Sequence, residues 1–249
     1  MSRIIHNKGM RNKEGGVDMT RKTALVAGGT GLVGKELLRL LLSSGEYEQV
    51  IAVVRTSLQY THPKLAEVLV DFNRLEDYKE HLVADDVFCC LGTTIKKAKT
   101  KKEMFKVDVE YPLLLAKIAK ENGAKQFLLV SAMGADSDST ISYSKMKGQL
   151  ELHIQKFTYE TLAIFRPSLL LGTRQEFRFG ERVGGLLFKL LSPLLVGSFS
   201  KYRAIEGKKV AKAMYMTAQA HKKGVLFVTS EEMRVLVDTK KGAVSKVIG

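Results

Sequence analysis

The chain has 249 residues, 45% of them hydrophobic, and a formal net charge of +14. This length suits one α/β domain with a small appended lobe, and no apolar run reaches the ~18 residues needed to cross a bilayer. The only two cysteines, Cys89 and Cys90, are adjacent, so we predict buried thiols in a reducing cytoplasm and no structural disulfide. No His, Cys and Asp residues have metal-ligand spacing, so we predict no metal site.

Residues 1–20 form a basic segment that contains glycines and lacks hydrophobic periodicity. We predict a disordered tail there, without the apolar stretch of a secretory signal. Basic charge is also typical of nucleic-acid binding, but no recognition motif or interleaved aromatic residues accompany it. Nucleic-acid binding is therefore only a third hypothesis, and residues 21–249 are predicted to form one domain.

A glycine-rich turn follows the first predicted strand, residues 23–27, and leads into an apolar helix from Lys35 to Leu42. This is the context of a dinucleotide-binding loop, in which glycines let a pyrophosphate approach the amides at the helix start. The spacing is Gly-x-x-Gly-x-x-Gly instead of Gly-x-Gly-x-x-Gly, and a plain loop is the alternative. We predict cofactor contacts from Gly28, Thr30, Gly31, Leu32, Val33 and Gly34.

Arg55 follows the second predicted strand, residues 50–54. A cofactor without a 2′-phosphate favours an acidic residue near this point, whereas an arginine can pair with the phosphate. We therefore predict that the protein prefers NADP(H) over NAD(H). The alternative interpretation is that Arg55 is merely an exposed side chain.

Further strands are predicted at residues 67–72, 87–91, 126–130 and 161–165, with helices over 101–122 and 143–156. Pro112 should kink the first of these helices or begin a new first turn. The alternation predicts an α/β fold with a doubly wound parallel sheet, in which ligands bind beyond the carboxyl ends of the strands. Residues that follow predicted strand ends are Gly28, Arg55, Asp71, Gly92, Ser131 and Pro167.

Tyr143 and Lys147 lie four residues apart on a predicted helix, with Ser131 twelve residues before Tyr143. Residues at this spacing share a helix face, and a nearby cation favours the ionised form of a phenol. Alone, the pair is more often an ordinary solvated helix face. Behind a glycine loop and after a strand, it indicates a proton donor at the end of a cofactor cleft.

These motifs together resemble the short-chain dehydrogenase/reductase superfamily, which has a Rossmann fold, and its extended and atypical branch in particular. Cys89-Cys90-Leu91-Gly92-Thr93-Thr94 and Arg174-Gln175-Glu176-x-Arg178 are similar to the Tat-interacting, NADPH-binding group of oxidoreductase-like proteins and their bacterial relatives. The resemblance covers roughly residues 20–230.

The resemblance implies a carbonyl reductase in which Tyr143 is the general acid, Lys147 assists it and binds the nicotinamide ribose, and Ser131 bonds the substrate oxygen. It further implies that Asp71 contacts the adenine. The cofactor contacts that it adds to those above are Asp71, Phe72, Leu91, Gly92, Thr93, Lys147 and Pro167.

Asp108 departs from this pattern, because many relatives carry an asparagine there that supports a proton-relay water. A second hypothesis is therefore an NADPH-binding regulatory or redox-sensing scaffold with little or no turnover. The substrate of the first hypothesis is a small carbonyl compound, bound by a small lobe around residues 172–205.

Two further segments allow more than one interpretation. The lysines between residues 96 and 102 are either solvated surface or a basic border that attracts an anion to the cleft. Residues 184–196 are the most apolar stretch outside the predicted sheet, and predict core or a pocket wall. The alternatives for that stretch are a subunit interface and contact with a membrane surface. For the protein as a whole we predict a homodimer or a protein partner.

Overall fold

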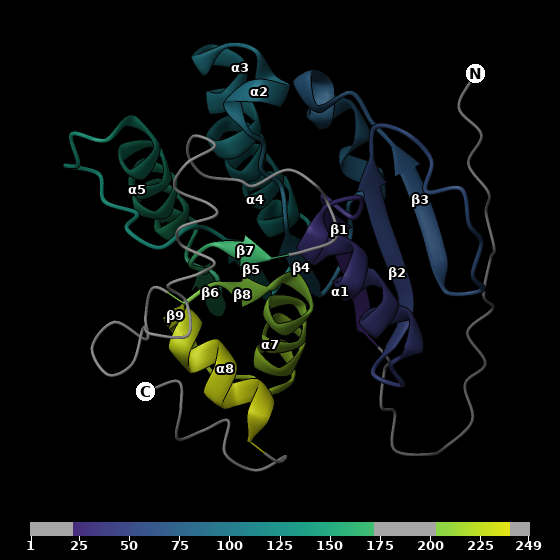
Figure 1. Cartoon of the computed structure of the whole chain (residues 1–249). Coiled ribbons are helices and arrows are strands. Elements are labelled where there is room, and N and C mark those ends of the chain that lie inside the picture. Colours follow the sequence, from purple (N-terminus) through teal and green to yellow (C-terminus); the bar gives the residue numbers. More distant parts are fainter. Residues whose placement is uncertain (1–21, 172–202, 240–249) are drawn as a thin grey trace.

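The computed structural model describes residues 22–171 and 203–239, and Figure 1 shows their arrangement. Seven parallel strands form one sheet in the order β3-β2-β1-β4-β5-β6-β9, which confirms the predicted doubly wound α/β fold. The strands are β1 (Lys22–Ala27), β2 (Tyr47–Val54), β3 (Leu65–Leu69), β4 (Asp86–Cys89), β5 (Gln126–Val130), β6 (Thr161–Arg166) and β9 (Gly224–Thr229). A separate two-stranded sheet pairs β7 (Leu170–Leu171) with β8 (Ile205–Glu206).

Helices cover both faces of the large sheet. They are α1 (Leu32–Ser43), α2 (Ile95–Ala98), α3 (Lys101–Phe105), α4 (Tyr111–Glu121), α5 (Ser142–Ile154), α7 (Gly207–Gln219) and α8 (Ser230–Asp238). Short helical segments are η1 (Phe72–His81), η2 (Lys106–Glu110) and η3 (Gln155–Phe157). Helices α1, α7 and α8 pack on one face, whereas α4, α5 and η1 pack on the other.

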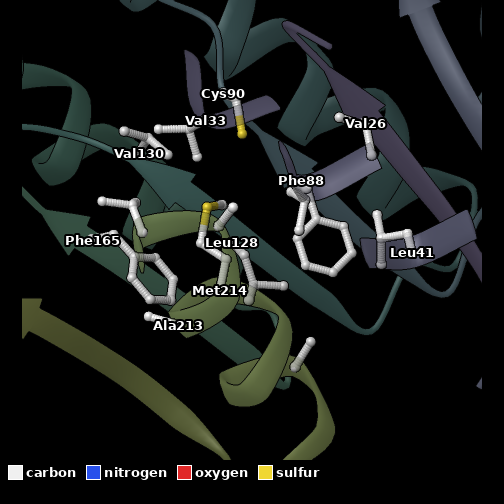
Figure 2. Packing of buried hydrophobic residues seen from close by; sticks show 14 of the residues in the cluster. Val26, Val33, Leu41, Phe88, Cys90, Leu128, Val130, Phe165, Ala213 and Met214 are labelled. Carbon is white, nitrogen blue, oxygen red and sulfur yellow. The ribbon is translucent and has the colours of Figure 1, made fainter. Parts of the chain in front are cut away.

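Alternate residues of each strand enter the two opposite cores. In β1, Val26 points toward α1 and α7, whereas Leu25 points toward the α4 side. Figure 2 shows the first of these cores, in which Phe88 and Leu128 of the sheet pack near Met214 of α7. Because both faces are buried, the strands read as continuous apolar runs in the sequence.

Cys89 and Cys90 follow the same alternation and confirm the interpretation as buried thiols. Cys89 lies in the α4 core and Cys90 in the α1 core, and neither forms a disulfide. Burial raises the pKa of the Cys89 thiol to about 12, so this thiol stays protonated at neutral pH.

Several predicted boundaries were wrong by a few residues. Helix α1 begins at Leu32, three residues before the predicted start, and β3 spans Leu65–Leu69 instead of 67–72. Strand β3 ends early because Asp71 turns the chain, with its carboxylate accepting the Asn73 amide at 2.9 Å.

The predicted helix over residues 101–122 contains a π-helical turn, η2, between α3 and α4. Pro112 follows this turn and has no amide hydrogen with which to bond the carbonyl of Asp108 four residues earlier. The Tyr111 amide instead donates to Lys106, five residues earlier. The expectation that Pro112 begins a new first turn is therefore confirmed, and such widened turns often occur at functional sites.

The four described elements that follow residue 203, which are β8, α7, β9 and α8, were not predicted. Helix α8 does carry a start signal in the sequence, because Thr229 and Glu232 form a capping box. Strand β9 is an edge of the sheet and leaves Phe227 40% exposed. The predicted basic tail, the apolar stretch 184–196 and all but the end of the predicted substrate lobe lie outside the described residues.

Candidate functional site

The glycine loop joins β1 to α1 through close backbone contacts. Gly28 has a φ of +85°, and a Cβ at this residue would lie 2.5 Å from the carbonyl oxygen of Cys90. A Cβ at Gly34 would lie 2.2 Å from the Gly28 carbonyl oxygen. The loop is closed by the Gly31 amide, which donates to Gly28 at 2.9 Å. These positions therefore exclude any side chain, as the predicted phosphate loop requires.

Helix α1 begins at this loop with Gly31 as its N-cap residue. Within the described part of the chain, no side chain caps this helix start. The amides of the first turn and the positive end of the helix dipole are therefore suited to an anionic group.

Arg55 and Asp71 follow β2 and β3 at the same edge of the sheet, and both are exposed. Hydrogen bonds from the Asn73 backbone and side chain hold the pKa of Asp71 below its usual value, so its carboxylate is ionised at neutral pH. The structure adds Tyr111, which the sequence analysis missed. Its ring stacks on Phe72 with centroids 5.3 Å apart, and its hydroxyl donates to Asn73 at 2.9 Å.

The turn after β4 holds Leu91, Gly92 and Thr93, all of them half-buried. The Thr93 amide donates to Asp108 Oδ2 at 2.9 Å, which connects this turn to the π-helical segment. The exposed lysines of the basic run follow on α2, on α3 and in the turn between them; they are Lys96, Lys97, Lys99, Lys101 and Lys102.

Lys147 and Asp108 form a buried ion pair. Their Nζ and Oδ1 atoms are 2.8 Å apart, and the two side chains are 3% and 1% exposed. Lys147 Nζ also lies 6.0 Å from the centroid of the half-buried Tyr143 ring, so α5 brings Tyr143 and Lys147 together as predicted. Asp108 accepts from two donors, Lys147 and the Thr93 amide, and an asparagine oxygen facing one of them would turn its NH₂ toward the other.

Ser131 lies at the end of β5 and is bonded to a residue that the sequence analysis did not select. Its hydroxyl donates to Glu151 Oε1 at 2.5 Å, and both residues are buried. Arg166, at the end of β6, donates to Glu151 through Nε and Nη2. The signal that would have found Glu151 is its place on α5, one turn after Lys147.

The loop between β5 and α5 is fixed by two backbone contacts. The Met133 amide donates to the carbonyl of the buried Pro167 at 2.9 Å, which connects the loop to the end of β6. A Cβ at Gly148 would lie 2.1 Å from the Ser137 backbone nitrogen, so only glycine lets the loop cross α5 beside Lys147.

Residues 22–171 and 203–239 contain no helix that is long and apolar enough to cross a membrane. The same residues contain no group of three His, Cys, Asp or Glu side chains that could hold a metal ion.

A sequence model described as NAD(P)H-binding matches residues 28–160. Protein HTATIP2 of Rattus norvegicus is 36% identical over 167 residues, which cover 66% of this chain and 69% of that protein. Protein FMP52, mitochondrial, of Candida glabrata is 31% identical over 238 residues, which cover 90% of this chain and 99% of that protein.

Two solved structures have the same fold. A UDP-glucose 4-epimerase of Thermotoga maritima with UDP-glucose has a TM-score of 0.60 at 16% identity, covering 89% of this chain and 87% of its own. MoeE5 in complex with UDP-glucose and NAD has a TM-score of 0.61 at 18% identity, covering 83% of this chain and 76% of its own. At these identities the likeness shows the fold alone.

Proposed function

Because the chain belongs to the NAD(P)H-binding family of Rossmann proteins, we propose that it is an NADPH-dependent oxidoreductase that reduces a small carbonyl compound. The observation that carries the proposal is the contact between Tyr143 and Lys147 on α5, with Lys147 Nζ 6.0 Å from the phenol ring. A phenol beside an ammonium group, after a strand of a dinucleotide-binding sheet, is suited to proton transfer to a substrate oxygen.

The glycine loop fits the pyrophosphate of such a cofactor, because Gly28 and Gly34 leave no room for a Cβ and the start of α1 offers amides. When bound, the cofactor supplies the hydride. The stacked rings of Phe72 and Tyr111 would lie toward its adenine end, together with Asp71. The other residues that would contact the cofactor are Gly28, Thr30, Gly31, Leu32, Val33, Arg55, Leu91, Gly92, Thr93, Lys147 and Pro167.

Three side chains would take part in the reaction of the substrate. Tyr143 would give its phenolic proton to the developing alkoxide, and Lys147 would orient the phenol and the nicotinamide ribose. Lys147 is itself held by Asp108, whose Oδ1 lies 2.8 Å from its Nζ. Ser131 would lie beside the substrate oxygen.

The test is oxidation of NADPH in the presence of a panel of aldehydes and ketones. We expect Tyr143→Phe to lower the rate on every active compound by about 10² to 10⁴, because it removes the acid and leaves the ring in place. Tyr60→Phe is the matched control, since Tyr60 is 42% exposed and lies outside the site. Full activity in the Tyr143→Phe protein would show that the acid is a different group.

Preference for NADP(H) is a separate proposal, supported by the exposed Arg55 at the end of β2. We expect Arg55→Ala to weaken NADPH binding by about tenfold, the worth of one charge-assisted hydrogen bond, and to leave NADH binding unchanged. Calorimetric titration of both cofactors measures this, with the exposed Arg39→Ala on α1 as control. An equal loss of affinity for NADPH and NADH would refute the role of Arg55.

A second candidate function is an NADPH-binding regulatory or redox-sensing scaffold. The Asp108–Lys147 pair favours it, because a lysine whose charge is balanced by a carboxylate exerts a weaker field on Tyr143 than a lone cation. Tight NADPH binding without turnover on any carbonyl compound would support this candidate.

The cytoplasmic location and a homodimer or protein partner stay predictions. The name of the Candida glabrata relative includes the word mitochondrial, so fractionation of cells is the measurement that tests the location.

A further inference from the structure

Ser131 has a single hydroxyl proton, and the partner of its oxygen determines where that proton points. Ser131 Oγ lies 2.5 Å from Glu151 Oε1, and the two residues are 5% and 3% exposed. An ionised carboxylate can only accept, so the serine is the donor of this bond. Its oxygen lone pairs are then the hydrogen-bonding capacity that remains for a ligand.

The Glu151 carboxylate is held from its other side by Arg166. Arg166 Nε and Nη2 lie 3.1 Å and 2.5 Å from Oε2, and Nε lies 3.2 Å from Oε1. The guanidinium is also stacked over the Phe227 ring, with Cζ 4.5 Å from the ring centroid. A guanidinium is permanently charged and only donates, so it pairs with the carboxylate and fixes its direction.

We propose that Glu151 is a positioning residue that orients the Ser131 hydroxyl, so that Ser131 acts toward a ligand as a hydrogen-bond acceptor. The ligand class that matches this arrangement carries a hydroxyl group at the reacting carbon, because an alcohol can donate to Ser131 and a carbonyl oxygen cannot. The inference rests on the proposed function, since it concerns the alcohol and carbonyl forms of one substrate pair. It reverses the polarity that the resemblance implies for Ser131.

Glu151→Gln should reverse the direction of the hydrogen bond between Ser131 and residue 151. The amide oxygen must face Arg166, since a guanidinium has no acceptor, and the amide NH₂ then takes the place of Oε1 beside Ser131. Ser131 would accept from this NH₂, and its hydroxyl proton would be released toward a ligand. The substitution changes one atom of the side chain and conserves its volume, so the exchange of polarity is its main consequence.

The experiment uses the full chain saturated with NADP⁺ and a matched pair of probes, cyclohexanol and cyclohexanone. Dissociation constants are measured by ligand-observed NMR, so the result does not depend on turnover, and failure of the reductase proposal is recognised separately by the absence of NADPH oxidation. We expect the wild-type protein to bind the alcohol more tightly than the ketone. The ratio of the two constants should shift about tenfold toward the ketone in Glu151→Gln, as one hydrogen bond predicts.

Ser131→Ala provides an independent check that does not alter Glu151, and it should abolish the alcohol preference. If Glu151 had a purely structural role, Glu151→Gln would weaken the binding of both probes equally, or would lower the melting temperature without changing the ratio of the two dissociation constants. Either result would overturn the proposal. The proposal is also overturned if the wild-type protein prefers the ketone, if neither probe binds, or if Ser131→Ala retains the alcohol preference.

Discussion

Asp108→Ala is expected to lower the free energy of unfolding by about 3–5 kcal/mol, because it leaves the Lys147 ammonium buried without its partner. The Thr93 amide loses its acceptor in the same variant. Urea denaturation measures the loss. A buried ammonium without a counter-charge is favoured to lose its proton, so the loss should be smaller at alkaline pH than at neutral pH.

The double variant Asp108→Leu, Lys147→Met is the control for this prediction. It replaces the pair by apolar side chains, and we expect it to recover most of the lost stability, because removing both charges removes the cost of burying them. It should nevertheless lack reductase activity. If Asp108→Ala is as stable as the wild-type protein at neutral pH, the pair is not buried as described.

Gly34→Ala is expected to weaken NADPH binding by about a hundredfold and to cost about 1–3 kcal/mol of stability. The added Cβ would lie 2.2 Å from the Gly28 carbonyl oxygen and 2.8 Å from its carbon, so the phosphate loop must move away from α1. Fluorescence titration with NADPH measures the first effect and thermal unfolding the second.

Gly45→Ala is the matched control, because a Cβ at Gly45 has no described atom within 4 Å and the residue lies just beyond α1. It should bind NADPH as the wild-type protein does. Normal binding by Gly34→Ala would show that the loop does not contact the cofactor.

The fold and the strand-end positions could be predicted because they depend on local patterns. Continuous apolar runs marked buried parallel strands, and glycine spacing marked the turn into α1. The four-residue spacing of Tyr143 and Lys147 was enough to place them together on α5, because helix geometry fixes that neighbourhood.

Apart from Glu151, which lies one turn after Lys147 on α5, the partners of these residues could not be predicted, since they come from other elements of the chain. Arg166 of β6 contacts Glu151 of α5, and Asp108 of η2 contacts Lys147 of α5, and neither contact follows from the spacing of residues within one helix. Gly148 gave no signal in the sequence, because its role is to let the loop at residues 136–137 cross the helix.

The most direct test of the central proposal is transfer of deuterium from NADPH that is labelled at its transferable position. With an active carbonyl compound, we expect mass spectrometry to find one deuterium per molecule of alcohol for the wild-type protein. Over the same time, the Tyr143→Phe protein should form almost no labelled alcohol. Tight NADPH binding without deuterium in any product, or equal amounts of labelled alcohol from the two proteins, would contradict the proposal that this site is a reductase in which Tyr143 is the acid.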